Sequence, residues 1–512
     1  MPEKELLLQE TGTALIYKDL PYNKYALKPK PLSAKERELA RVLSSLLQRK
    51  SPLSSASFQS LTETESTPII EGLRDFLQRV PSHLLETLPS SEEQKNLEKL
   101  VSSFFDKTAL FVHDSKALAK EVIELSFGYG RLTPLVSDDD LEEIMFNKVN
   151  APLFAYHRRH GLCQVQLSLD KDEVGTLIER IARFAGKEVS ERYPLLEANF
   201  PDGSRINVTV PPASPKSPSI TIRKFTKSPV TLLDLIQNNT FNLEIAAFLW
   251  AAVEGFSLYP LNVLVCGSTG AGKTTLLNAL SVFVPKSDRI VSVEDTLELQ
   301  LWGKENWVQM QSRPGYKESP DLTMNDLLKS SLRMRPDRII VGEVRGAEAQ
   351  TMFTAMNVGH RGSMGTLHSN SAAETVLRLT GEPMNVPKNM MTLVDLIVVI
   401  HRIYSRQKGL IRRVFEVSEV TRGDQGVALS PLYSWDYGTD SIKKQDIPSQ
   451  SIEKLSKYTG RSKKEVEMEI GRRQAVLEWM ISKKINSVEG IDTVVQAYYT
   501  HPSVVFDQMN KE

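Results

Sequence analysis

One glycine-rich stretch of the chain carries the residue types of a phosphate-binding loop. Gly267, Gly272, Lys273 and Thr274 fit the pattern G-x-x-x-x-G-K-[ST] in full. The glycines allow backbone N–H groups to turn toward phosphate oxygens, the lysine can reach the β- and γ-phosphates, and the threonine hydroxyl can bind Mg²⁺. The predicted site for ATP and Mg²⁺ consists of Gly267, Ser268, Thr269, Gly270, Ala271, Gly272, Lys273, Thr274 and Thr275.

The surroundings of this loop favour the same interpretation over a chance glycine turn. The apolar run "LNVLVC" precedes the loop and has the composition of a buried strand. The run "KTTLLNALSVF" follows it and has the spacing of a helix, whose N-terminus would add positive partial charge at the phosphates. The order strand, loop, helix is the context that the pattern requires.

Carboxylates follow two other predicted strands. Glu343 ends the apolar run "RIIVGEV", and Glu294, Asp295 and Glu298 occur in "VSVEDTLEL". The carboxyl ends of strands in a parallel sheet line the ligand crevice, so we expect these groups near the γ-phosphate. Glu343 is the predicted residue that orients the attacking water, with Glu294 as the alternative. Both are also candidate Mg²⁺ ligands beside Thr274, while a solvent-exposed strand end or a helix cap remains the structural alternative.

Two histidines flank a run of small residues in "GHRGSMGTLHS". His368 falls at the predicted end of a strand, which makes it a candidate sensor of the γ-phosphate or of water. His360 precedes the same strand. A zinc site is not expected, because no further cysteine or histidine ligands lie nearby and the chain has only 2 cysteines.

The composition limits the function class. The chain has 512 residues, with 63 Lys plus Arg balanced by 63 Asp plus Glu. Zero net charge argues against nucleic acid as the main partner, because nucleic-acid binding needs a basic surface. The basic cluster "HRIYSRQKGLIRR" is expected to be a solvated hairpin, with a membrane contact as the second interpretation. Few cysteines indicate a reducing compartment, and neither a signal peptide nor a bilayer-spanning run is predicted.

The pattern of apolar and polar residues along the chain predicts an α/β protein with three segments. Residues 1–109 form a variable N-terminal segment that includes the Ser/Thr-rich stretch 51–68, interpreted as a linker. Residues 110–228 mix strand and helix patterns. Residues 229–512 alternate short β-branched runs with helices, which indicates a parallel sheet covered on both faces, followed by C-terminal helices.

Taken in order, these motifs resemble those of the type II/IV secretion ATPase family. The resemblance covers residues from about 110 to the C-terminus, and departures include Gly346 after Arg345 and the lack of a four-cysteine insert. The segment "FGYGRLTPLVSDDDLEEIMFN" is similar to archaeal members. The matching segments are "GSTGAGKTT", "VSVEDTLEL", "RMRPDRIIVGEVRG", "GHRGSMGTLHSNS", "PDGSRINV" and "ITIRKF".

The resemblance implies an architecture and partners. A RecA-like P-loop NTPase domain would follow a smaller α+β, PAS-like domain and the variable helical N-terminal segment. The protein would form a homohexameric ring at the inner face of the cell membrane, as a peripheral cytoplasmic protein on a polytopic membrane platform. Arg205 and Arg223 match the arginines that approach the nucleotide from the first domain in this family. Without the resemblance, both would be interpreted as surface arginines.

The motifs and the resemblance together predict an ATPase motor. ATP hydrolysis would drive assembly of a type IV pilus-like filament, an archaellum or secretion across the cytoplasmic membrane. One alternative is a conjugation-type or DNA-translocating hexameric ATPase. Another is a nucleotide-gated scaffold without turnover, against which the retained Lys273, Thr274 and Glu343 argue.

Overall fold

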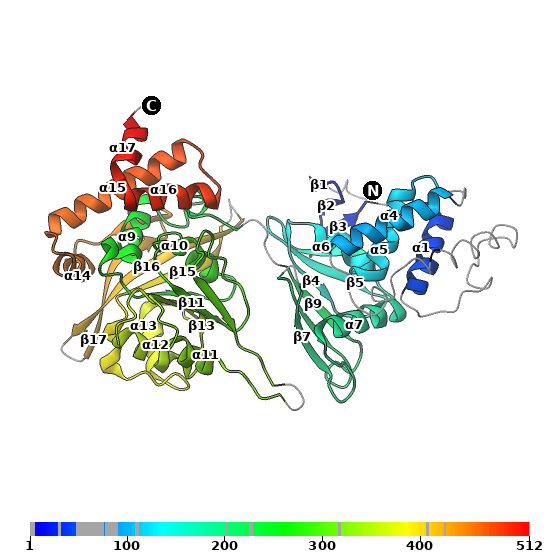
Figure 1. Cartoon of the computed structure of the whole chain (residues 1–512), viewed down its shortest axis with the longest axis horizontal. Helices are drawn as coiled ribbons and strands as arrows, with labels where there is room; N and C mark the ends of the chain where they lie inside the picture. Colours follow the sequence, from blue (N-terminus) through cyan, green and yellow to red (C-terminus); the bar gives the residue numbers. More distant parts are fainter. Residues whose placement is uncertain are drawn as a thin grey trace, which may run out of the picture. The chain divides into compact units, whose positions relative to one another are not determined.

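The chain folds as two compact units, residues 1–227 and 228–512, each with its own large sheet (Figure 1). The computed structural model describes residues 6–28, 32–47, 76, 91–107, 112–200, 203–224, 229–315, 319–405, 409–423 and 426–510. The predicted linker at 51–68 lies outside these described residues. No helix within them is both long enough and apolar enough to span a bilayer.

The sheet of the first unit has the strand order β1-β2-β3-β6-β5-β4-β9-β8-β7. Its strands are antiparallel apart from β3, which pairs in parallel with β6. The first strands of the chain therefore continue the sheet formed farther along the sequence. The strands are β1 Leu6–Glu10, β2 Ala14–Lys18, β3 Asn23–Leu27, β4 Leu141–Phe146, β5 Pro152–His157, β6 Gly161–Ser168, β7 Leu195–Asn199, β8 Arg205–Thr209 and β9 Ser219–Arg223.

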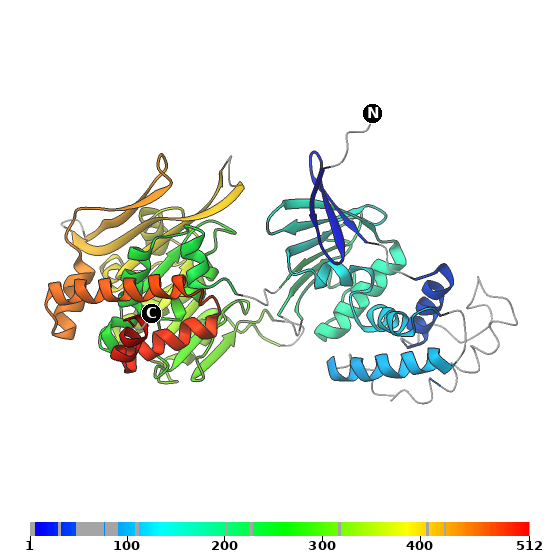
Figure 2. The same ribbon diagram turned by 90° about the horizontal axis from the view of Figure 1, so that it is seen from above.

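Helices of the first unit form two packing groups. α7 packs on the sheet, whereas α1, α4 and α5 share a separate apolar cluster and stand together in Figure 2. α7 begins with a capping box between Asp170 and Glu173, in line with the acidic start that the sequence shows. The described helices are α1 Ala34–Leu47, α4 Ser91–Lys107, α5 Ser115–Phe127, the 3₁₀ turn η2 Gly130–Leu132, α6 Thr133–Ser137 and α7 Lys171–Ala185.

The sheet of the second unit has the order β12-β11-β13-β14-β10-β15-β16-β17-β18. Strands from β12 to β15 are parallel, and β15 to β18 form an antiparallel extension of the sheet. The strands are β10 Val263–Cys266, β11 Ile290–Glu294, β12 Trp307–Gln311, β13 Arg338–Val344, β14 Met364–Leu367, β15 Leu396–Ser405, β16 Gly409–Gly423, β17 Gly426–Asp436 and β18 Ser441–Lys444.

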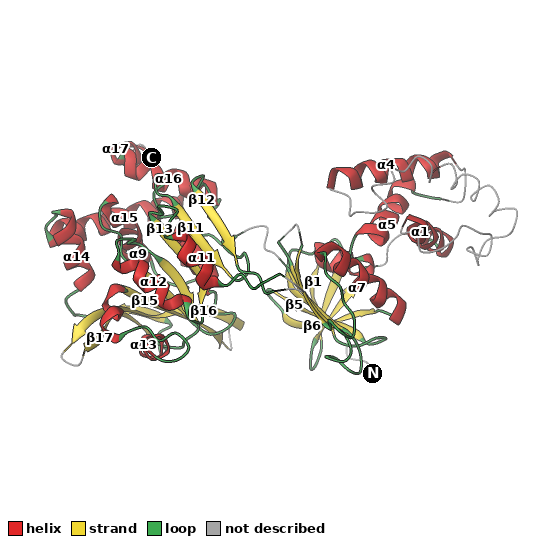
Figure 3. Ribbon diagram, turned by 60° about the horizontal axis from the view of Figure 1, so that its bottom comes forward, coloured by secondary structure: helices red, strands yellow, loops and turns green. Residues whose placement is uncertain are grey.

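Helices cover both faces of this second sheet (Figure 3). Alternate residues of β10 face opposite cores: Val263 and Val265 pack with α9 and α10, while Leu264 and Cys266 pack with α11, α12 and α13. The helices are α8 Leu232–Gln237, α9 Leu243–Glu254, η3 Gly255–Ser257, α10 Lys273–Ser281, α11 Met324–Ser331, α12 Glu348–Asn357, α13 Ala372–Thr380, η4 Lys388–Leu393, α14 Gln450–Thr459, α15 Lys463–Ser482, α16 Val488–Thr500 and α17 Pro502–Asn510.

Two helices of this unit follow directly from local sequence patterns. The apolar run at 245–253 lies within α9, and every residue of that run is buried. Ser462 and Glu465, three residues apart, form a capping box at the start of α15. Both helices contribute to the same hydrophobic core, so the C-terminal helices cover one face of the sheet of the second unit.

The parallel register gathers the candidate site at one edge. Cys266 of β10 pairs with Leu367 of β14, and Val341 of β13 pairs with Val293 of β11. The residues that follow these positions leave the sheet at its carboxyl edge, which is where parallel sheets place their ligand crevices. Sequence segments up to a hundred residues apart therefore meet around the glycine-rich loop.

Candidate nucleotide site

The glycine-rich loop connects β10 to α10. Gly270 and Gly272 have φ values of +71° and +98°, a region that side chains other than glycine rarely adopt. α10 begins at Lys273 and has no side-chain cap at its N-terminus. Its first N–H groups therefore remain available for an anion, and the helix dipole favours negative charge at that end.

Lys273 is the cation at the base of the loop, and only 8% of it is exposed. Its Nζ lies 3.2 Å from the carbonyl oxygen of Ser268 and 3.2 Å from Nδ1 of His368. Burial lowers the pKa of Lys273, and the nearby Glu343 carboxylate opposes that shift. A phosphate dianion would supply the negative charge that this buried ammonium needs.

His368 lies between the lysine and the carboxylate of Glu343. Its Nε2 is 2.7 Å from Oε1 of Glu343, and the Lys273 ammonium lies 3.2 Å from Nδ1 and 3.3 Å from Nε2. A neutral imidazole carries a single ring proton, and the contact with Glu343 is close without being a hydrogen bond, because Oε1 of Glu343 is buried with no hydrogen-bond partner in the described part of the chain. Burial and the charge of Lys273 lower the pKa of His368, which favours this neutral form at physiological pH.

Glu343 also contacts a guanidinium that follows it in the chain. Arg345 Nη2 donates to Oε2 of Glu343, and Nη1 lies 3.3 Å from a carboxylate oxygen of Asp295. The hydrogen bond from Arg345 to Glu343 raises the pKa of Arg345. Glu343 is thus held between His368 and Arg345 at the mouth of the loop.

Glu294 has a different environment, although it ends the neighbouring strand β11. Only 1% of Glu294 is exposed. Its carboxylate accepts from the backbone N–H groups of Glu298 and Leu299, at 2.7 Å and 2.8 Å, and from Nε2 of Gln309 at 2.8 Å. Burial raises the pKa of Glu294, and these hydrogen bonds oppose that shift. The Glu294 carboxylate therefore accepts hydrogen bonds from groups inside the protein.

Glu298 completes the acidic side of the loop. Oγ1 of Thr274 donates to Oε2 of Glu298 over 2.9 Å. The threonine hydroxyl, Glu298 and Glu343 supply oxygen atoms of the kind that Mg²⁺ prefers, and Mg²⁺ usually needs only one or two carboxylates beside phosphate and water. The residue types fit a Mg²⁺ ion that is bound together with a nucleotide.

Two arginines of the β15–β16 hairpin cover the outer side of the loop. Arg402 and Arg412 pair directly across the strands, and Nε of Arg412 donates to the carbonyl oxygen of Gly270 over 3.2 Å. A Cβ atom at Gly270 would lie 2.9 Å from Nη1 of Arg402. Neither arginine has a carboxylate partner within the described part of the chain. The predicted solvated hairpin therefore brings positive charge to the phosphate-binding loop.

Arg205 and Arg223 belong to the first unit, on β8 and β9. They are direct partners in the antiparallel register, so their side chains project from the same face of the sheet. On its other side, Arg223 pairs with Glu143 of β4. Like charges in directly opposite positions repel one another, and an anion placed between them would relieve that repulsion.

His360 and His368 lie at opposite ends of β14. Nδ1 of His360 is 2.9 Å from the carbonyl oxygen of Pro336, before the start of the strand. His368 follows the strand and reaches Lys273 and Glu343. Only His368 is therefore placed beside the loop, which agrees with the choice made from the sequence.

Comparison with known proteins decides the family. The family model described as "Type II/IV secretion system protein" matches residues 131–486. The chain belongs to this family. That membership confirms the motif-based assignment, the α/β P-loop fold class and the ATPase class.

Proteins similar to this chain come from archaea and bacteria. An uncharacterised protein of Methanocaldococcus jannaschii is 43% identical over 275 residues, which cover 53% of this chain and 38% of that protein. The type IV secretion system protein PtlH of Bordetella pertussis is 31% identical over 328 residues, covering 57% of this chain and 94% of PtlH. The crystal structure of the VirB11 ATPase from Brucella suis is 28% identical, covers 56% of this chain and 95% of VirB11, and has a TM-score of 0.29.

The sequence did not single out every residue that the structure brings to the secretion ATPase site. Arg345, Gln309 and the hairpin arginines Arg402 and Arg412 were not among the candidates. Arg345 lies within the segment "RMRPDRIIVGEVRG" that carries the resemblance, and its charge was the available signal. Arg402 and Arg412 belong to the basic cluster, but only the register of β15 and β16 shows that they pair and reach the loop.

Proposed function

We propose that this chain is the motor of a secretion or pilus-type machine. It hydrolyses ATP to drive assembly of a type IV pilus-like filament or secretion across the cytoplasmic membrane. The observation that carries the proposal is the connected set Lys273, His368 and Glu343 at the phosphate-binding loop. A loop that only holds a nucleotide needs no histidine-linked carboxylate beside its lysine.

Each residue of the set has a distinct role in this proposal. Lys273 and the loop N–H groups bind the phosphates, and Glu343 orients the attacking water and accepts its proton. His368 holds Glu343 in place and changes partner when Lys273 turns toward a γ-phosphate. Its link to both residues makes it a sensor of whether that phosphate is present.

Thr274, Glu298 and Glu343 are the residues that would hold Mg²⁺ beside the phosphates. Bound there, Mg²⁺ neutralises charge that develops on the transferred phosphoryl group. Glu294 is the alternative carboxylate for the metal or for water. Glu294, however, is buried and already accepts three hydrogen bonds. Glu343 is therefore the better candidate for both roles.

The proposed assembly is a homohexamer, bound as a peripheral protein to a polytopic platform at the inner face of the membrane. Arg205 and Arg223 would complete the site by contacting the phosphates, where a positive fork stabilises the transition state. Their paired placement on β8 and β9 supports this role, because both can bind one anion together. Family membership supports an association with membrane machinery.

A conjugation-type machine is the second candidate. PtlH, which is similar to this chain, is by its name a type IV secretion protein. Gly346 directly after Arg345 also resembles the conjugation and tight-adherence branches of the family. Translocation of DNA would require binding to single-stranded DNA that weakens steeply with salt.

The deciding experiment measures ATP turnover by the full chain at increasing protein concentration. If the site is completed by a second subunit, specific activity rises with concentration, and Lys273→Ala abolishes turnover. Binding of ATP without turnover, at all concentrations and with phospholipid vesicles, would replace the motor by a nucleotide-gated scaffold. Stimulation by single-stranded DNA would favour the DNA-translocating alternative.

A further inference from the structure

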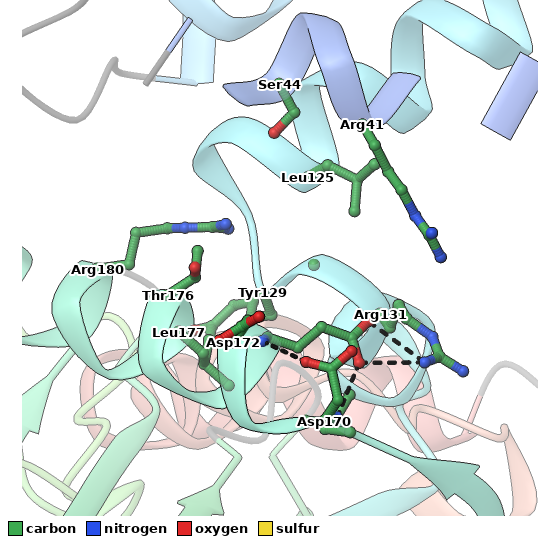
Figure 4. A pocket seen from close by; sticks show the side chains of 13 residues that line it. Arg41, Ser44, Leu125, Tyr129, Arg131, Asp170, Asp172, Thr176, Leu177 and Arg180 are labelled. Carbon is green, nitrogen blue, oxygen red and sulfur yellow. Dashed lines mark hydrogen bonds and ion pairs between the residues drawn. The ribbon is translucent and has the colours of Figure 1, made fainter. Parts of the chain in front are cut away.

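The first unit contains a cavity of about 340 Å³ that no step of ATP hydrolysis uses (Figure 4). α1 and α5 line it on one side, and the η2 turn and α7 line it on the other. Its volume lies at the lower end of the range for small-molecule sites. The lining residues that matter are Arg41, Ser44, Tyr129, Thr176 and Arg180.

Arg180 is the central cation of this cavity. Its Nη1 donates to the carbonyl oxygen of Gly128 over 2.6 Å, whereas its buried Nε has no hydrogen-bond partner in the described chain. Burial, with a smaller effect of Arg183, lowers the pKa of Arg180 to about 10. Nε is thus buried without an acceptor, and Nη2 beside it has no hydrogen bond to the described residues, so this edge of the guanidinium can bind an oxyanion through two hydrogen bonds.

Arg41 adds a second guanidinium from α1. It has no ion-pair or hydrogen-bond partner among the described residues, and Figure 4 shows it reaching toward the cavity from a different element than Arg180. Ser44, Tyr129 and Thr176 place hydroxyl groups on the same lining. The cavity therefore has two guanidinium groups on a partly polar lining.

The carboxylates of the cavity do not neutralise Arg180. Glu173 pairs with Arg131 at 3.3 Å, and Asp170 accepts the N–H of Glu173 as the helix cap. Asp172 is exposed and precedes Arg180 by eight positions, or about 12 Å along the helix axis, which is beyond the range of strong coupling in salt solution. None of these three lining carboxylates is paired with Arg180.

We propose that this cavity binds a small phosphate-bearing anion through Arg180 and Arg41. A tetrahedral phosphate offers enough oxygen atoms for the side-on edge of Arg180 and for the guanidinium of Arg41 at the same time, whereas a carboxylate has only two oxygen atoms to divide between them. The bound anion would join α1 to α7, and so tie the N-terminal helices to the sheet-packed helix. The site is separate from the phosphate-binding loop and does not depend on the proposed motor function.

The test uses the full chain with Lys273→Ala, which weakens competing binding at the phosphate-binding loop. Binding of radioactive inorganic phosphate is measured by equilibrium dialysis, alone and after adding Arg180→Lys, Arg41→Ala or Arg183→Ala. We expect Arg180→Lys and Arg41→Ala to weaken binding by about tenfold, since each removes a guanidinium that contacts the anion. Arg183→Ala is the control, because it removes one positive charge, as Arg41→Ala does, from a position on α7 outside the cavity lining.

Hydrogen exchange locates the bound phosphate. We expect slower exchange at residues 118–132 and 171–186 when phosphate is present, and no such change with Arg41→Ala. Equal phosphate binding by all three variants would overturn the proposal, as would acetate that competes as well as phosphate. If Arg180→Lys prevents folding by losing its bond to Gly128, Arg41→Ala decides the question, because Arg41 makes no hydrogen bond or ion pair with the residues that the structure describes.

Discussion

Glu343 and Glu294 end neighbouring strands, yet their neighbours give the two carboxylates different properties. Glu343 lies beside His368 and Arg345, at the mouth of the loop. Glu294 is buried and accepts from two backbone N–H groups and one amide. At the residue scale, one carboxylate is positioned for a water molecule and the other for holding the 294–299 turn.

Substitution by glutamine should separate these roles. Glu343→Gln keeps the shape but removes the base, so we expect turnover to fall about 100-fold or more while nucleotide binding persists. Glu294→Gln places an amide NH₂ against donors inside the protein, which should lower the free energy of unfolding by about 1–3 kcal/mol. Steady-state turnover, ADP binding and urea unfolding of both variants provide the measurements.

The two roles would be exchanged if Glu294→Gln lost turnover without any loss of stability while Glu343→Gln stayed active. Glu294 would then be the residue that activates water. Asp295→Asn is a suitable control, because Asp295 is exposed and lies in the same motif. We expect that variant to change stability little, as its contact with Arg345 is a surface ion pair.

At the scale of elements, β15 fixes the shape of the phosphate-binding loop. β10 and β15 run in parallel, and the chain of β15 passes directly beside the first glycine of the loop. A Cβ atom at Gly267 would lie 2.3 Å from the carbonyl oxygen of Ile400. The hairpin that continues from β15 then brings Arg402 and Arg412 over the same loop.

Two alanine substitutions should differ because of this packing. Gly267→Ala forces a shift of strand backbone, so we expect the larger loss of stability, about 2 kcal/mol or more, together with loss of nucleotide binding. Gly270→Ala meets mainly the flexible end of Arg402 and adds strain from its positive φ, for which we expect about 1 kcal/mol. Thermal unfolding and ADP titration compare the two variants, and the opposite order would show that β15 does not constrain the loop.

At the scale of the whole molecule, the chain carries cationic groups in both units. Arg402 and Arg412 belong to the unit of the phosphate-binding loop, while Arg205 and Arg223 form their pair in the other unit. A motor that couples hydrolysis to domain movement needs contacts from the first unit that depend on the nucleotide. Arg205 and Arg223 are the candidates for those contacts.

Arg205→Ala and Arg223→Ala should each lower turnover by about 100-fold or more, because a guanidinium that stabilises the transition state is lost. ADP binding and the unfolding temperature should change little, since the loop lies in the other unit. Arg159→Ala, in an exposed turn of the first unit, is the matched control. Normal turnover in both variants would remove these arginines from the mechanism.

The sequence by itself determined the loop, the order of the motifs and the family. These features are local: a strand, a glycine turn and a helix N-terminus follow one another within the segment 262–283, and each has a recognisable residue pattern. The capping box at Ser462 and the buried helix α9 were predictable for the same reason. The periodicity of a helix or a strand can be recognised from the spacing of apolar residues that are close in sequence.

Only the tertiary structure decided which side chains meet. The pairing of β3 with β6, the access of Arg412 to Gly270 and the burial of Glu294 all depend on contacts between distant segments. Strand register sets such contacts, and a shift by one residue would turn every side chain to the other face. A local pattern can name a carboxylate at a strand end, but it cannot tell how many donors from other strands surround it.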